Sequence, residues 1–236
     1  MGKIWAVCSG SGGVGKTMIA LSLAAGAAKA GRRVILLDTS GVSRCCDLIL
    51  RMESIVTLDM LDVLRSQISM ESALYASERY PGLRLACASL YDDVSVSELS
   101  GMTLSLNALC DVLVVDLPTG QANLGRGVMR PGDERLFITR PDDASIRATE
   151  RLMTRCAGGP AADSLVINRV SAARIRSRTQ HAQGTVENLL DRVAVACIPE
   201  DPSIPASEQL GRAAIECDGP AWTVLSGLVK TLLGNA

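Results

Sequence analysis

A glycine-rich segment near the N-terminus carries the residues with the clearest chemical meaning. Residues 10–17 read GSGGVGKT and match the phosphate-binding pattern G-x-x-x-x-G-K-[ST] at every fixed position. Glycines let consecutive backbone N–H groups converge on phosphate oxygens, and the helix that follows adds the positive end of its dipole. In this pattern Lys16 reaches the β- and γ-phosphates, and the Thr17 hydroxyl binds Mg²⁺. The segment therefore predicts a site for a nucleoside triphosphate with magnesium.

The elements around this loop predict an α/β fold. An apolar strand at 3–8 precedes the loop and an alanine-rich helix follows it from Met18. Further apolar strands are expected at 32–38, 82–88, 111–116, 134–139, 164–168 and 192–198. Helices fit between them, including 144–155 and 185–191, and a helix at 222–233 closes the chain. This alternation predicts one α/β domain over residues 1–236, with seven strands in a mainly parallel sheet and helices on both faces. Together with the phosphate-binding loop, it indicates a P-loop NTPase domain.

Polar residues at the ends of the predicted strands extend the site. Ligands bind at the carboxyl ends of strands in such sheets, where Asp38, Asp116 and Asn168 all fall. Asp116 is expected to hold Mg²⁺ through water, and Asn168 to offer a donor and an acceptor to a purine edge. The turn at 117–120 either senses a γ-phosphate or is a plain turn, and the turn at 199–202 either closes over the base or is simply a polar turn.

The net charge and the cysteines indicate which partners and which cellular compartment to expect. The net charge of −1 argues against a chain that coats nucleic acid by bulk electrostatics. The eight cysteines form no C-x-x-C pair, and Cys8, Cys87 and Cys197 fall in apolar strands, so we expect reduced thiols in a cytoplasmic protein without a signal peptide. Cys45 and Cys46 are adjacent in a predicted loop, where a redox or metal role is the less favoured alternative.

Two segments bear on membranes and nucleic acid. The C-terminal helix lines up Ala221, Leu225, Leu228 and Leu232 on one face and carries a single cation, Lys230, so it is expected to close the core rather than anchor the chain to a membrane. The arginine-rich segment 169–178 lacks interleaved aromatic residues. We expect a solvated loop or a protein-binding surface there rather than a DNA site.

The chain resembles the MinD/ParA family of P-loop ATPases, and within it the MinD branch. The resemblance extends from residues 9–17 through 36–38, 47–49, 116–120, 139–147 and 166–169 to 198–201, which is nearly the whole chain. The motifs and the resemblance together place the nucleotide on Gly10, Ser11, Gly12, Gly13, Val14, Gly15, Lys16, Thr17, Met18, Asn168, Arg169, Pro199, Glu200 and Asp201. The expected metal ligands are Thr17 and Asp116, and the expected catalytic residues are Lys16 and Asp38.

Two departures from the family pattern affect the expected hydrolysis. Ser11 stands where the family has a signature lysine that reaches the phosphates of a dimer partner, and Ser40 stands where it has the second Asp of a D-x-D motif. Basic residues supplied to phosphoryl groups contribute factors of roughly 10³–10⁵ in comparable NTPases. We therefore expect binding of Mg²⁺–ATP to persist and any ATP-dependent homodimer to be weak, unless another cation such as Arg44 crosses the interface.

Three functions remain open from the sequence. The favoured one is a slow ATPase that changes protein partners with its nucleotide state. An ATP-binding scaffold with little or no hydrolysis is the second, supported by Ser11 and Ser40. A ParA-like positioning protein on DNA is the third, supported only by the arginine-rich segment.

Overall fold

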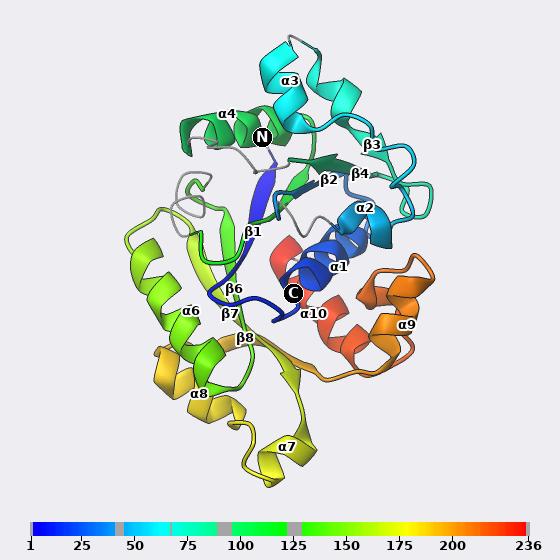
Figure 1. Ribbon diagram of the computed structural model, residues 1–236. Coiled ribbons are helices and arrows are strands. Elements are labelled where there is room, and N and C mark those ends of the chain that lie inside the picture. The colour runs from blue at the N-terminus through cyan, green and yellow to red at the C-terminus, as the bar shows by residue number, and fades with distance from the viewer. Residues whose placement is uncertain (1, 41–44, 67, 89–95, 122–128, 235–236) are drawn as a thin grey trace.

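One eight-stranded sheet forms the centre of the protein (Figure 1). A computed structural model describes residues 2–40, 45–66, 68–88, 96–121 and 129–234. The strands lie in the order β3-β4-β2-β5-β1-β6-β7-β8, and every neighbouring pair is parallel except β3 with β4. Their bounds are β1 Lys3–Ser9, β2 Val34–Asp38, β3 Tyr75–Ala76, β4 Leu83–Cys87, β5 Val112–Asp116, β6 Glu134–Thr139, β7 Ala162–Val170 and β8 Ala194–Pro199.

Helices cover both faces of this sheet, with α1 and α10 on one face and α4, α6 and α8 on the other (Figure 1). The described α-helices are α1 Lys16–Lys29, α2 Cys46–Ile49, α3 Met60–Ser66, α4 Val96–Ala108, α6 Asp143–Cys156, α7 Ala172–Arg176, α8 Gln183–Leu190, α9 Ser203–Gln209 and α10 Ala221–Leu233. Short 3₁₀ turns lie at Met70–Ala73 and Ala214–Glu216.

The central strands are mostly apolar in their interiors because both faces of the sheet are covered. In β1, Trp5 and Val7 pack on the side of α1 and α10, whereas Ile4 and Ala6 pack on the opposite side. Successive side chains of a strand point to opposite faces, so a strand covered on both sides is expected to be apolar at consecutive positions. The predicted α/β class and mainly parallel sheet are confirmed.

The sequence-based element list is wrong in three details. The sheet has eight strands rather than seven, because the two-residue β3 adds to its edge by pairing antiparallel with β4. Cys46 begins the short helix α2 instead of lying in a loop, and the arginine-rich segment contains the short helix α7. Each of these elements has only two to five residues, too few to show a periodic pattern.

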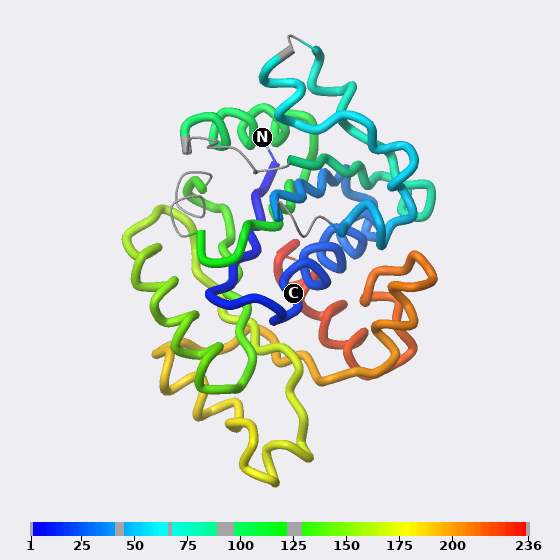
Figure 2. The backbone as a smooth tube through the Cα atoms, viewed as in Figure 1, coloured from blue at the N-terminus to red at the C-terminus, as the bar shows by residue number. Residues whose placement is uncertain are grey.

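The order of strands brings distant segments to one edge of the sheet. Asp38 lies directly opposite Asp116 in the β2–β5 register, and β5 also pairs with β1. Figure 2 follows the chain from β1 through residues 10–15 into α1, so the glycine-rich loop starts at this same edge. The fold thereby places the loop and both carboxylates together.

Candidate functional site

The glycine-rich loop adopts a conformation that its glycines permit. Gly13 and Gly15 have φ angles of +70° and +91°, a region that residues with a Cβ rarely enter, and Gly15 immediately precedes α1. Gly10 packs so closely on α6 that a Cβ there would stand 2.2 Å from the Ala148 carbonyl oxygen. Gly12, by contrast, faces open space. The loop is therefore fixed at its two ends and open along its middle.

Lys16, Thr17 and Asp116 form a buried cluster beneath the loop. Lys16 Nζ lies 2.5 Å from Asp116 Oδ1, and the Thr17 hydroxyl donates a hydrogen bond of 2.6 Å to Asp116 Oδ2. Asp116 is fully buried and Lys16 is 7% exposed. The beginning of α1 and the end of β5 thus bring together a cation, a hydroxyl and a carboxylate that lie about a hundred residues apart in the chain.

Burial governs the electrostatics of this cluster. It raises the pKa of the Asp116 carboxyl, an effect that the ion pair with Lys16 opposes and the nearby Asp38 carboxylate reinforces. A second cation within reach of these two carboxylates would lower their mutual repulsion. The site therefore has the charge arrangement of one that receives a metal ion.

Asp38 is also fully buried, and local groups hold its carboxylate. Ser40 donates to Asp38 Oδ1 from its hydroxyl, at 2.5 Å, and from its backbone N–H, at 2.9 Å. The Cys46 backbone N–H donates to Asp38 Oδ2 at 3.2 Å. Ser40, where the family pattern has a second Asp, thus orients the first carboxylate but adds no charge.

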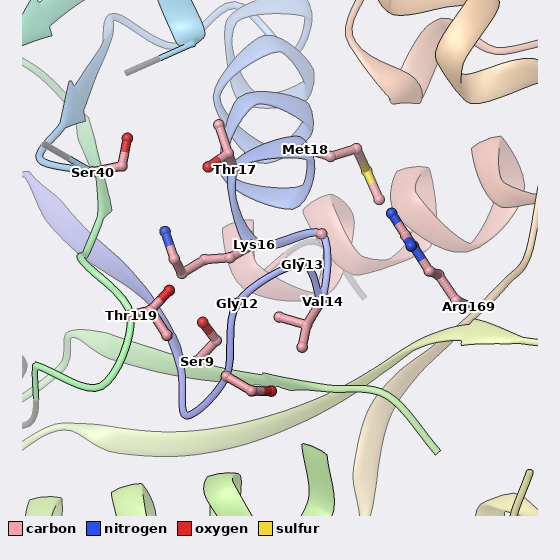
Figure 3. A pocket seen from close by; sticks show the side chains of 12 residues that line it. Ser9, Gly12, Gly13, Val14, Lys16, Thr17, Met18, Ser40, Thr119 and Arg169 are labelled. Atoms are coloured by element: carbon pink, nitrogen blue, oxygen red, sulfur yellow. The ribbon is translucent and has the colours of Figure 1, made fainter. Parts of the chain in front are cut away.

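A cavity of about 290 Å³ opens over the loop. Figure 3 shows Lys16 and Thr119 pointing toward one end of this cavity and Met18 and Arg169 lying at the other. Thr119 belongs to the turn predicted at 117–120, whose Gly120 N–H donates to the Ser9 carbonyl oxygen at 2.9 Å. The turn therefore lies directly against the start of the glycine-rich loop.

A second cavity of about 580 Å³ adjoins the first and shares Gly15, Met18 and Arg169 with it. It is lined by the residues that the sequence placed around a base, namely Asn168, Arg169, Pro199, Glu200 and Asp201. Arg169 has a φ of +57°, which is uncommon outside glycine and marks a backbone held in place by its surroundings. Except for Gly10, which packs on α6, the predicted loop and base residues thus line two adjoining cavities, which together are called the hollow.

Two of the residues predicted to surround the base also form structural hydrogen bonds within the protein. The Asn168 side chain is 1% exposed and donates a hydrogen bond of 2.7 Å to the Val14 carbonyl oxygen, so it supports the glycine-rich loop. Asp201 accepts bonds from the Ser203 hydroxyl and the Ala221 N–H, at 2.6 and 3.0 Å. Burial alone would raise the pKa of Asp201, but its hydrogen bonds outweigh burial and the pKa is lowered.

Thr119 and Pro202 line the first and second cavities, and both lie in turns that the sequence offered for the site. Sequence reasoning did not predict that Ser9 and Ser40 line the first cavity, or that Ser171, Ile204, Pro205 and Glu208 line the second. Glu208 lies on α9, beyond the turn that was expected to close over the base. Burial raises its pKa, while Arg169 opposes that rise. No local sequence pattern pointed to this helix, because its place at the site depends on how the chain folds back after β8.

The residues at the departures from the family pattern have local partners. Ser11 lies 3.5 Å, oxygen to oxygen, from the hydroxyl of Ser145 in the first turn of α6. Arg44, the cation expected to compensate for Ser11, lies outside the described residues. The eight cysteines are free thiols, as expected.

The C-terminal helix and the arginine-rich segment also have definite places. In α10, Ala221, Leu225, Leu228 and Leu232 are buried, which confirms that this helix closes the core. The residues of α7 carry no buried side chain, and Arg174 forms an ion pair with Glu200. None of the described helices combines the length and the apolar character needed to cross a membrane.

Known proteins resemble this chain over nearly all of its length. The septum site-determining protein MinD of Synechocystis is 28% identical over 222 residues, which cover 91% of this chain and 82% of that protein. The solved MinC:MinD cell division complex of Aquifex aeolicus superposes with a TM-score of 0.86 at 23% identity, covering 99% and 96% of the two chains. MinD of Pyrococcus horikoshii, solved with Mg-ADP, gives a TM-score of 0.84 at 22% identity, covering 98% and 96%.

A sequence model of a whole protein family also matches this chain. The match covers residues 5–214, which include the glycine-rich loop, both buried carboxylates and the residues of the second cavity. The chain belongs to the CobQ/CobB/MinD/ParA nucleotide binding domain family.

Proposed function

We propose that this protein is a MinD-like, magnesium-dependent ATPase of low turnover that acts as a nucleotide-dependent switch in intracellular positioning or regulation. The cluster of Lys16, Thr17 and Asp116 beneath the glycine-rich loop carries the proposal. The adjoining second cavity supplies room for a nucleoside. The whole chain, residues 1–236, is proposed to act as one nucleotide-binding domain.

The residues present fit a triphosphate and its metal. Gly12 and Gly13 face open space along the cavity, so phosphate oxygens can approach the backbone N–H groups there. Thr17 and Asp116 offer the hydroxyl and carboxylate oxygens that Mg²⁺ prefers. Magnesium bound on these residues would neutralise phosphate charge and orient the terminal phosphoryl group.

Each residue has a distinct proposed task. Lys16 exchanges its ion pair with Asp116 for the β- and γ-phosphates, which leaves Asp116 with Thr17 for the metal. Asp38, held by Ser40, orients a water beside the metal site. Arg169 and Asn168, with the turn at Pro199, Glu200 and Asp201, enclose the nucleoside.

An ATP-binding scaffold with little or no hydrolysis is the second candidate. It is supported by Ser40, which adds no second carboxylate beside Asp38, and by Ser11, whose hydroxyl contacts Ser145 and provides no cation for a phosphate. Both replacements reduce turnover rather than binding, because neither residue belongs to the Lys16–Thr17–Asp116 cluster.

A nucleotide titration combined with phosphate release, each with and without Mg²⁺, tests the proposal. The switch ATPase predicts saturable ATP binding in the micromolar range or tighter, and slow, magnesium-dependent phosphate release that Lys16→Ala removes. Binding without release would favour the scaffold. Equal thermal stabilisation of the wild type and Lys16→Ala by ATP would contradict both candidates.

We further propose a protein partner and a weak ATP-dependent homodimer in the cytoplasm. The Aquifex aeolicus relative was solved with MinC, which supports a partner protein for this chain as well. Membrane and nucleic-acid binding are not expected, because α10 buries its apolar face and the net charge is −1. DNA binding that weakens with salt would revive the ParA-like alternative.

A further inference from the structure

A thiol lies next to the two buried carboxylates at the strand ends. The ligand atoms of Asp38, Cys46 and Asp116 all lie within 4.8 Å of one another, and all three residues are fully buried. They come from three separate elements, the end of β2, the start of α2 and the end of β5. The convergence is therefore a product of the tertiary fold and not of neighbouring positions in the chain.

The charges of this cluster leave room for a cation. Lys16 pairs with Asp116, so it neutralises one of the two carboxylates. Asp38 accepts hydrogen bonds from Ser40 and the Cys46 N–H, and no ion pair to it occurs within the described parts of the chain. Among the described residues, Asp38 therefore has hydrogen-bond donors but no cation beside it, and a carboxylate buried in this way favours a nearby cation.

The donor atoms differ from those of an ordinary magnesium site. Magnesium takes oxygen ligands, whereas thiolate sulfur selects softer metals such as zinc and cobalt. Zinc binds oxygen and sulfur at about 2.0–2.3 Å in a tetrahedron, which puts neighbouring ligand atoms about 3.5 Å apart. The three ligand atoms lie within 4.8 Å of one another, so the distances between them need to shorten by only about 1 Å to reach that geometry.

We propose that Asp38, Cys46 and Asp116 bind one thiophilic divalent cation of the zinc class, with water in the fourth position. The Cys46 thiol proton leaves to solvent as the sulfur–metal bond forms, and Asp116 binds through the carboxylate oxygen that is not paired with Lys16. Because Asp116 also belongs to the proposed magnesium site, zinc competes with Mg²⁺–ATP and inhibits the protein.

Cobalt binding to the full-length protein, without nucleotide or magnesium, tests the site. Co²⁺ bound to sulfur gives a near-ultraviolet charge-transfer absorption that Co²⁺ on oxygen ligands lacks. We expect one Co²⁺ per chain with this absorption, displaced by Zn²⁺ but not by millimolar Mg²⁺. Cys46→Ser should remove the absorption and weaken Co²⁺ binding at least tenfold, and Asp38→Asn should weaken it similarly.

Cys45→Ser is the matched control, since Cys45 precedes Cys46 and belongs to no such cluster among the described residues. It should leave the absorption intact. Absence of bound Co²⁺, binding without the absorption, or loss of the absorption in Cys45→Ser would each overturn the proposal. Unfolding temperatures of the metal-free variants identify any misfolded protein, and Cys46→Ala then replaces Cys46→Ser.

The test is independent of the ATPase proposal because no nucleotide is present. Failure of Co²⁺ binding with retained ATP binding rejects the soft-metal site alone. Loss of ATP binding with retained Co²⁺ binding rejects the proposed function alone.

Discussion

The two halves of the hollow are constructed differently. In the phosphate half, backbone glycines and three charged or polar side chains converge from β1, α1 and β5, and the sheet register fixes their positions. In the second half, residues from the ends of β7 and β8 and from α9 line a larger space, and several of them are occupied with supporting the protein. The phosphate half presents backbone that is open at Gly12 and Gly13, whereas the second half presents mainly side chains.

This difference follows from what each half is proposed to hold. Phosphate charge requires closely spaced donors in a fixed geometry, so only particular residues at particular spacings suffice. A base is flat and largely apolar at its faces, and many combinations of side chains can enclose it. Substitutions in the first half should therefore weaken ATP binding strongly, and those in the second half should weaken ATP binding only mildly.

The largest effect is expected from Lys16→Ala. Its removal takes the cation from the phosphates and leaves Asp116 buried without its ion-pair partner, so ATP binding should weaken more than about a hundredfold. Calorimetric titration with Mg²⁺–ATP measures the loss. Lys29→Ala is the matched control on the same helix, because Lys29 forms an exposed ion pair with Glu216 and should leave binding unchanged.

Substitutions at two glycines of the loop should affect different properties, protein stability at Gly15 and ATP binding at Gly12. Gly15→Ala forces a side chain into a φ of +91° and within 2.3 Å of the Asn168 amide nitrogen, so it should lower the unfolding free energy by about 1–3 kcal/mol. Gly12→Ala meets open space and should keep normal stability while weakening ATP binding, since its methyl group lines the cavity. Chemical denaturation and ATP titration of both variants decide this, and equal stability of the two would contradict it.

The same contrast between the two halves explains which site residues could be predicted from the sequence. Lys16, Thr17 and Asp116 were identified because phosphate chemistry restricts residue type and spacing, and the long buried strands because parallel sheets demand continuous apolar runs. Glu208 was missed because its approach depends on how α9 folds back, which no local pattern encodes. The support that Asn168 gives to Val14 joins residues 154 positions apart and becomes visible only in three dimensions.

Restoring charge at the departures from the family pattern should raise activity. Ser11→Lys adds a cation at the loop, and Ser40→Asp adds a second carboxylate beside Asp38. Together they should increase turnover at least about tenfold and strengthen ATP-dependent dimerisation. Phosphate release and light scattering report the two effects. A wild type that already forms a tight ATP-dependent dimer would contradict the electrostatic argument, and Arg44→Ala shows whether that residue supplies the missing cation.

The second cavity is expected to bind adenine moderately more tightly than guanine. No N-K-x-D pattern follows Asn168, and Asp201 uses its carboxylate within the protein. We expect ATP to bind about fivefold more tightly than GTP, measured by competition. Glu208→Gln sharpens the test, because a carboxylate that contacts the guanine amino group would make this variant still more selective for ATP. Displacement of bound ATP by GTP at equal concentration contradicts the preference.

The smallest effect should be a change in the pH dependence of stability at Glu208. Burial raises its pKa above 4.5 in the folded chain, so the folded state retains the proton to higher pH than the unfolded state. Stability from this group is therefore complete below the unfolded pKa and declines as pH rises through the raised value.

Glu208→Gln should flatten that decline by less than about 0.5 kcal/mol, measured by denaturation between acidic and neutral pH. Glu187→Gln is a control of opposite sign. Hydrogen bonds from Gln183 and the Ala194 N–H lower the pKa of Glu187, so its contribution is present at neutral pH and is lost as pH falls. If both variants changed the profile in the same direction, the charge of Glu208 would not be what makes this half of the hollow sensitive to pH.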